Sequence, residues 1–411
     1  MTLDLRTGRP VWLLNKPRIP RNQRLKGNIR STVVVVGGGV SGALVAHRLT
    51  EMGIQVTLVE ARKIGAGSTA ASTAILSYEA DVNLGDLIRR IGKRSAVRAY
   101  QAGVEAINSL AATIKGLDGS CDFKKRRSLY LASSSKDVSL LRRECQIRQK
   151  NDFNVRSVLN RELTKTFSLS APCAILNEEA AEVNPVKLTL SLVRCARKKG
   201  LKVFTDTKVM AYRREGKVSV LTTDGNCTIR ARNVIFATGY ESQEFLKQKS
   251  VRLTSSYAIA SKPRMKFPKN YEYPVIWETA RPYLYVRSTA DRRIVAGGED
   301  VDFVDEDKRD RLLGSKTKIL ERKIRKMFPH TSWTLGAAWT GTFAESSDGL
   351  PYIGPHKDFP GALFALGYGG NGITFAVIAS LIIPDLILGL NNSDAKIFRF
   401  GRKARRRTAH W

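Results

Sequence analysis

Cysteine and histidine are both scarce in this chain of 411 residues, which contains five cysteines and four histidines. The cysteines are scattered and form no Cys-x-x-Cys pair, which is typical of reduced thiols in a cytoplasm rather than of a disulfide framework. No histidine lies at metal-ligand spacing from a cysteine or from another histidine, so the sequence predicts no metal site.

Long apolar segments are rare as well. The first thirty residues are polar and contain proline, without the apolar stretch of a signal peptide. The segment 373–390 is mostly apolar, but Pro384 and Asp385 interrupt it. We interpret it as a buried helix, because a membrane span needs about 20 apolar residues. We therefore expect a cytoplasmic protein, peripheral at most to the inner membrane face.

Acidic residues are few relative to basic ones: 37 Asp and Glu against 69 Lys and Arg give a formal net charge of +32. Such a balance attracts the phosphates of nucleic acid, anionic lipid or an anionic cofactor. The simpler interpretation is a solvated basic surface, and no aromatic-rich nucleic-acid motif accompanies the basic clusters. The cluster 402–407, in a basic C-terminal tail over 391–411, is a candidate for peripheral contact with anionic lipid or nucleic acid.

A glycine-rich loop follows the first β-branched run of the chain. Residues 32–36 predict a buried parallel strand, and Gly37, Gly39 and Gly42 then satisfy the pattern G-x-G-x-x-G. A helix over 43–51 and a second strand over 54–60 follow, and that strand ends on Glu60. This order of strand, loop, helix, strand and acid predicts a dinucleotide site.

Each part of that motif has a physical task. Gly37 allows the tight turn, Gly39 lets the backbone approach a pyrophosphate, and Gly42 lets helix and strand pack closely. The free N–H groups at the start of the helix hold phosphate charge. Glu60 can accept hydrogen bonds from the adenosine ribose.

The residues after Glu60 point to FAD. The stretch A-R-K-I-G-A-G-S-T-A-A-S at 61–72 resembles the loop after the second strand in the D-amino-acid oxidase and glycine oxidase superfamily. N-V-I-F-A-T-G at 233–239 resembles the strand and turn that return to the dinucleotide in that superfamily, and D-G-L-P-Y-I-G at 348–354 with the glycine-rich turn at 364–373 resembles its last segment. The stretch 287–298 and the lead-in at 25–27 are similar to the γ-glutamylputrescine oxidase-like branch.

The resemblance implies an α/β fold in two domains. A Rossmann-like FAD-binding domain of the glutathione-reductase type would be assembled from 31–85, 180–250 and 335–390, after an N-terminal lead-in of 1–30. A substrate domain of α+β type, with a mainly antiparallel sheet, would take 86–179 and 251–334. Sarcosine oxidase-like members of the superfamily attach their flavin through a cysteine a few residues before the D-G-x-P motif. Residues 340–347 contain no cysteine, so the implied FAD is non-covalent.

The motif and the resemblance together give a set of expected FAD contacts, spread along the chain from residue 37 to residue 373. They are Gly37, Gly39, Val40, Ser41, Gly42, Glu60, Ala61, Arg62, Gly67, Ser68, Thr69, Val209, Ala237, Thr238, Gly239, Asp348, Gly369, Gly370, Asn371, Gly372 and Ile373.

The candidates for the substrate pocket are mainly aromatic, since aromatic side chains can cage an amine and shield the flavin. They are Trp277, Tyr283, Tyr285, Arg287, Trp339 and Phe343. Arg287 could bind a substrate carboxylate or form a surface ion pair. The resemblance places the uncharged Phe343 and Gly370 where glycine oxidase-like enzymes carry carboxylate-binding arginines, which favours larger amines over simple amino acids.

The predicted activity is FAD-dependent oxidation of a C–N bond in a small amine or amino acid. A hydride passes to flavin N5, the resulting imine hydrolyses, and oxygen or an electron carrier is the acceptor. A neutral amine needs no obvious acid–base pair, which suits a chain poor in histidine. Two alternatives stay open: a dehydrogenase of a non-amine substrate that passes electrons to a quinone or carrier, and a flavoprotein that acts on or binds RNA.

Overall fold

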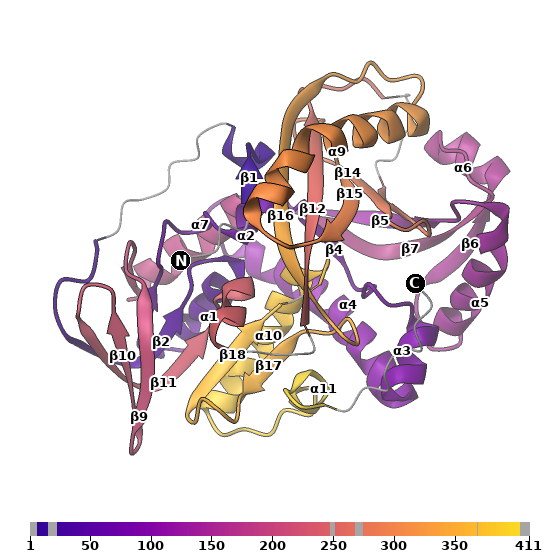
Figure 1. Cartoon of the computed structure of the whole chain (residues 1–411). Helices are drawn as coiled ribbons and strands as arrows, with labels where there is room; N and C mark the ends of the chain where they lie inside the picture. The colour runs from indigo at the N-terminus through magenta and orange to yellow at the C-terminus, as the bar shows by residue number, and fades with distance from the viewer. Residues whose placement is uncertain (1–5, 15–22, 247–250, 268–273, 368, 403–411) are drawn as a thin grey trace.

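The computed structural model describes residues 6–14, 23–246, 251–267, 274–367 and 369–402. These residues form two β-sheets. Most helices pack around the smaller sheet and along the lower edge of the longer one (Figure 1). The chain passes between the two sheets several times, so each sheet combines segments that are far apart in the sequence.

The smaller sheet, called here the parallel sheet, has the strand order β17-β18-β11-β2-β3-β8. Its strands are β2 (Ile29–Val36), β3 (Val56–Val59), β8 (Lys202–Phe204), β11 (Thr228–Phe236), β17 (Tyr352–Pro355) and β18 (Ala362–Leu366), with β9 (Val209–Glu215) and β10 (Val218–Thr223) joined through β11. Its core strands are parallel: β2 pairs with both β3 and β11 in that sense.

Alternating side chains of β2 divide the packing around the parallel sheet, because successive residues of a strand point to opposite faces. Val33 and Val35 belong to a cluster with the helices α1 (Val40–Glu51), α7 (Pro185–Lys198) and α10 (Gly372–Ile387). Val34 and Val36 pack instead with residues of β10 and β11. Both faces are therefore covered, which explains the unbroken valine run.

The other sheet, called here the long sheet, has the order β1-β16-β12-β15-β14-β13-β5-β7-β4, with β6 paired to β7. Its strands are β1 (Arg6–Gly8), β4 (Ile75–Ser77), β5 (Lys124–Leu131), β6 (Val155–Leu159), β7 (Cys173–Glu182), β12 (Val251–Ser261), β13 (Val275–Glu278), β14 (Leu284–Ser288), β15 (Ile294–Asp302) and β16 (Leu335–Ser346). Only the β13–β5 pair is parallel among the described strands of this sheet.

Helix α9 (Glu306–Met327) lies across the outer face of the long sheet (Figure 1). Its buried Leu320 and Ile324 share a cluster with Tyr257 and Ile259 of β12. The remaining helices are α2 (Ser68–Ala71), α3 (Leu84–Ile91), α4 (Lys93–Lys115), α5 (Val138–Gln149), α6 (Asn160–Phe167), α8 (Gln243–Leu246) and α11 (Ala395–Phe398), with 3-10 turns η1 (Val11–Leu13), η2 (Ser135–Asp137) and η3 (Gly239–Ser242).

The predicted fold class is confirmed, with a Rossmann-like layer and a mainly antiparallel second sheet. The strand pairing corrects the expected boundaries at four places, and two of them are residues 75–77 and 180–182, which pair with each other in the long sheet. Residues 335–346 belong to the long sheet, because β16 pairs with β12 along its length, and residues 6–8 add an edge strand to it. Helix α10 is the apolar segment near the C-terminus. Within the described part of the chain, no helix combines the length and apolar character that a membrane crossing needs.

Candidate functional site

The glycine-rich loop joins the end of β2 to the start of α1. Gly37 has φ of +111°, and its N–H donates to the carbonyl of Val59 in the neighbouring strand at 2.8 Å. A Cβ added to Gly42 would lie 1.9 Å from the carbonyl oxygen of Gly37, so only glycine fits at this helix–loop contact. The loop therefore has the backbone that a dinucleotide pyrophosphate requires.

The carboxylate of Glu60 is held at the end of β3 by two backbone donors. Its Oε2 accepts from the N–H of Gly38 at 2.5 Å, and its Oε1 accepts from the N–H of Arg62 at 2.7 Å. Burial raises the pKa of Glu60, and the two N–H donors partly oppose that rise. This side chain is thus fixed beside the loop, where the motif predicts a ribose partner.

The loop 61–72 closes over the start of α1. Thr69 Oγ1 accepts from the N–H of Val40 at 2.9 Å, which ties α2 to the first turn of α1. Arg62 pairs with Glu241 at 2.7 Å, and this pair joins the loop to the turn after β11. The local contacts thus bring three distant segments to one place.

A cavity of about 840 Å³ extends from these segments to the inner face of the long sheet. Most expected FAD contacts line it: Gly37, Gly39, Val40, Ser41, Glu60, Ala61, Arg62, Gly67, Ser68, Thr69, Val209, Ala237, Thr238, Gly239, Gly369, Gly370, Asn371, Gly372 and Ile373. Five of the six pocket candidates line it too: Trp277, Tyr283, Tyr285, Trp339 and Phe343.

The part of the cavity near the glycine-rich loop fits an FAD. Thr238 Oγ1 is buried there and has no hydrogen-bond partner among the described residues, so it is available to a ligand. A Cβ on Gly39 would lie 3.1 Å from Thr69 Oγ1, so the missing side chain leaves room for a close approach. Among the described residues that line the cavity, none is a cysteine or a histidine, and the mode of FAD attachment stays a prediction.

The opposite end of the cavity has aromatic walls. Trp277 stacks on Tyr130 with ring centroids 3.6 Å apart and planes 3° apart, which fixes the indole. The hydroxyl of Tyr285 lies 3.1 Å from Ser256 Oγ. Trp339 is fully buried, and its Nε1 donates to the carbonyl of Ala71 at 2.8 Å. The ring of Trp277, the hydroxyl of Tyr285 and the indole of Trp339 are therefore each held by a neighbouring residue.

Carboxylates accompany the aromatic side chains. Asp81 and Asp300 line the cavity, and Asp81 Oδ2 accepts from the N–H of Gly370 at 2.7 Å. Burial raises the pKa of Asp81 above its ordinary value and raises that of Asp300 to about 6. Burial and the nearby Asp81 and Asp300 raise the pKa of Glu345 to about 7. Among the described residues that line this end, the exposed Arg281 is the basic one.

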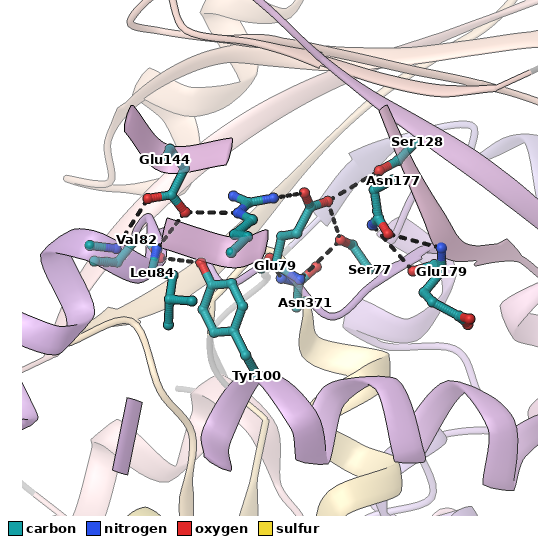
Figure 2. A network of polar contacts seen from close by, with 12 residues as sticks. Ser77, Glu79, Val82, Leu84, Tyr100, Ser128, Glu144, Asn177, Glu179 and Asn371 are labelled. Atoms are coloured by element: carbon teal, nitrogen blue, oxygen red, sulfur yellow. Dashed lines mark hydrogen bonds and ion pairs between the residues drawn. The ribbon is translucent and has the colours of Figure 1, made fainter. Parts of the chain in front are cut away.

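A buried network supports the segment that carries Asp81 (Figure 2). Glu79 and Glu144 both pair with Arg148, which is fully buried. Glu144 also accepts from the N–H groups of Leu84 and Gly85 at 2.7 and 3.1 Å. The network therefore fixes residues 79–85 from both ends.

The same network reaches the glycine-rich turn before α10. Glu79 accepts from the hydroxyls of Ser77 and Ser128 at 2.9 and 3.2 Å. The side chain of Asn371 donates to the backbone carbonyl of Glu79, as Figure 2 shows. Asn371 thus joins the segment 79–81 to the turn.

A family model described as FAD dependent oxidoreductase, DAO, matches residues 32–386. The chain belongs to this FAD-dependent oxidoreductase family. The residues that line the first part of the cavity are therefore the candidate site of an FAD cofactor.

Individual relatives agree with this assignment over most of their length. A glycine oxidase of Bacillus subtilis is 25% identical over 379 residues, covering 90% of this chain and 97% of that protein. A gamma-glutamylputrescine oxidoreductase of Escherichia coli is 24% identical over 385 residues, covering 89% and 85%. The solved glycine oxidase of Geobacillus kaustophilus has the same fold, with a TM-score of 0.73, 20% identity, and coverage of 89% and 96%.

Arg287 lies outside the cavity lining, contrary to the prediction that places it among the pocket residues. Its side chain is 2% exposed and donates to the backbone carbonyls of Ala74, Val183 and Ser288 at 2.7 to 2.9 Å. It lies on the same strand as Tyr285 but beyond the cavity, where residues 73–74 cover it. Burial lowers its pKa to about 10. Arg287 therefore links β14 to residues 73–74 and to the residue that follows β7.

Asp348 is the second correction. It lies outside the cavity lining, is 1% exposed and pairs with Arg402 at 2.6 and 2.7 Å. It also accepts from the N–H of Leu350, so it organises the turn before β17. Gly42 is likewise outside the lining, where its predicted packing task places it.

The basic tail is described only in part. Arg402 forms an ion pair with Asp348, and residues 403–411 lie outside the described residues. Contact of the tail with lipid or nucleic acid therefore stays a prediction. Among the described residues, one group has potential metal-ligating atoms within 4.8 Å of one another: His47, Glu51 and Cys195. Lys199 already pairs with Glu51 at 2.7 Å and disfavours a cation there.

Proposed function

We propose that this flavoprotein oxidises a C–N bond of a small amine, with oxygen or an electron carrier as the final acceptor. The observation that carries the proposal is the far end of the cavity, where aromatic walls surround carboxylates next to the FAD segments. Aromatic faces and carboxylates together favour a nitrogen cation over an alcohol or an anionic substrate.

The basic groups of the cavity are consistent with an amine. Arg62 is paired with Glu241, and Arg6 Nε donates to the carbonyl of Ala66, so both belong to the FAD end. Arg281 lies exposed and places its guanidinium 4.8 Å from the ring centroid of Tyr283. Lys208 also lines the cavity, next to the expected FAD contact Val209. Phe343 and Gly370 line the cavity without charge, so within the described lining Arg281 is the basic side chain that remains for a carboxylate at this end.

The names of the relatives support the same substrate class. Glycine oxidase and gamma-glutamylputrescine oxidoreductase are named for compounds that carry amino groups. Their identities to this chain are only 25% and 24%, so they support a type of bond rather than a particular substrate.

When bound, FAD supplies the acceptor for a hydride from the carbon next to nitrogen, and the resulting imine is hydrolysed by water. The chain's own residues bind, orient and shield. Trp339 and Phe343 wall the cavity against solvent, and Asp81 and Asp300 favour the approach of an amine. Asn371 and the Gly370 N–H hold the turn at the FAD end against Glu79 and Asp81.

Isotopic substitution tests the proposal. Amines deuterated at the carbon next to nitrogen should be oxidised several-fold more slowly than ordinary amines, because that C–H bond breaks, whereas deuterium elsewhere should have no effect. The product should be a carbonyl compound with one equivalent of ammonia or amine. Turnover of alcohols of the same length with no turnover of amines would contradict the proposal.

A further inference from the structure

The long sheet contains an irregularity where it borders the cavity. Ser255 and Tyr257 of β12 pair with Val301 and Gly298 of β15, so two residues of β15 lie opposite one residue of β12. These two are Glu299, which has φ of +58°, and Asp300. Such a bulge changes the direction of side chains along a strand.

The bulge gives the two acids different surroundings. Glu299 faces α9, where its carboxylate pairs with Lys323 at 2.7 Å and Lys316 at 3.3 Å. Asp300 lines the cavity instead, and its Oδ1 is buried with no hydrogen-bond partner among the described residues. An unpaired buried carboxylate oxygen is costly, so it indicates a partner that arrives with the ligand.

Charge at this end of the cavity is unbalanced. Asp81 and Asp300 lie close enough to Glu345 to raise its pKa. The cations that lower the pKa of Glu345 are Arg252 and Arg281. Arg252 already pairs with Asp302 on the surface, and Arg281 is exposed. The nearby positive charge therefore does not offset the negative charge of the three carboxylates, and a cationic group of a ligand would reduce their mutual repulsion.

The reacting nitrogen of an amine is not well suited to be that cation. A C–H bond next to nitrogen yields a hydride when the nitrogen lone pair is free to form the imine, so the reacting nitrogen must lose its proton. Carboxylates stabilise the protonated form of a neighbouring amine. A cluster of them therefore suits a second nitrogen that stays charged throughout the reaction.

We propose that Asp300, with Asp81 beside it, forms a cation subsite that selects diamines and related polyamines over monoamines and amino acids. The inference rests on the proposed amine oxidation and adds a specificity-determining residue to it. Asp300 binds the distant ammonium group, while Trp277 and the tyrosines surround the carbon chain between the two nitrogens.

Three ligands of equal chain length test the subsite: butylamine, 1,4-diaminobutane and 4-aminobutanoate. Calorimetric titration of the dithionite-reduced holoprotein without oxygen measures their binding, because the reduced protein cannot consume them. At pH 8 the diamine should bind about tenfold more tightly than butylamine, since a charge-assisted contact of this kind corresponds to about one factor of ten. The zwitterion should bind most weakly.

The variant Asp300→Asn should remove most of the preference for the diamine and leave butylamine nearly unchanged. Asp302→Asn is the matched control, because it removes the same charge two residues further along β15, where the side chain is exposed and pairs with Arg252. If Asp300→Asn does not fold, Asp81→Asn takes its place and should weaken the diamine in the same direction.

The results separate the subsite from the proposed function. If 4-aminobutanoate binds more tightly than both amines, this end of the cavity binds a carboxylate through Arg281, and the proposed cation subsite is overturned. An unchanged diamine preference in Asp300→Asn would overturn it too. If the preference is lost in Asp300→Asn but no amine reduces the oxidised flavoprotein, the subsite stands and the proposed oxidation fails.

Discussion

Glu345 makes stability depend on pH in a direction opposite to that of most carboxylates. It lies on β16, and burial together with Asp81 and Asp300 raises its pKa from an ordinary 4.5 to about 7. Below pH 4.5 the carboxyl is neutral in both the folded and unfolded chain. As pH rises towards 7, the unfolded chain loses its proton first, so the stability that the neutral carboxyl contributes is progressively lost.

The variant Glu345→Gln removes this effect while keeping the size of the side chain. The difference in pKa corresponds to at most about 3 kcal/mol of unfolding free energy at pH 8. Because the unfolding entropy is about 2 cal/mol/K per residue, a chain of this length should gain about 3 °C in melting temperature. At pH 4.5 the variant should have no such advantage.

Thermal unfolding of both proteins with saturating FAD, in steps from pH 4.5 to 8, measures the prediction. Glu162→Gln is a control of opposite sign, because the contact of Glu162 with Arg156 at 2.5 Å lowers its pKa. That variant should gain nothing as pH rises. The reasoning is refuted if the advantage of Glu345→Gln is the same at pH 4.5 and pH 8, or is larger at pH 4.5.

Three further substitutions test other parts of the structure. Gly42→Ala should lower the ratio of flavin to protein absorbance sharply, because its Cβ would lie 1.9 Å from a backbone oxygen, whereas Gly314→Ala, with open space around it, should keep full flavin. Arg287→Met should lower the free energy of unfolding in urea by about 3 kcal/mol, because buried carbonyls lose their donor. An unchanged free energy of unfolding, together with an altered preference for carboxylate-bearing substrates, would show that Arg287 binds substrate after all. Arg148→Met should cost about 3–5 kcal/mol, because it leaves two buried carboxylates without a counter-charge, and a loss below about 1 kcal/mol in the same assay would contradict the network's supporting role.

The FAD end of the cavity was accessible from the sequence because its requirements are local. The turn at Gly37, the contact at Gly42 and the acid at Glu60 all lie within one strand–helix–strand unit, so their spacing carries the information. The later segments were found by resemblance to a known superfamily. They meet at the cavity because the parallel sheet brings β2 and β11 together.

The aromatic end of the cavity was harder to predict, because its acidic residues come from separate elements. Asp81 follows β4, Asp300 lies at a bulge in β15 and Glu345 lies on β16. Residues 297–299, Gly-Gly-Glu, gave a local signal, since adjacent glycines within a strand favour a bulge. No pattern in the sequence showed that the three carboxylates meet.

Arg287 shows the limit of strand periodicity. Alternation along β14 places its side chain on the same face as that of Tyr285. The cavity ends before it, however, because the carbonyls of Thr73 and Ala74 cover that position. Where a cavity stops along a strand depends on a segment more than 200 residues away, which periodicity cannot show.

The visible spectrum of the purified protein, recorded without oxygen before and after addition of amines, tests the central claim most directly. We expect a yellow protein whose flavin band bleaches with an amine and returns when an electron acceptor is admitted. Diamines should bleach it at lower concentrations than monoamines of equal length. A flavin band that no amine bleaches, but that an alcohol of similar size does, would contradict the account.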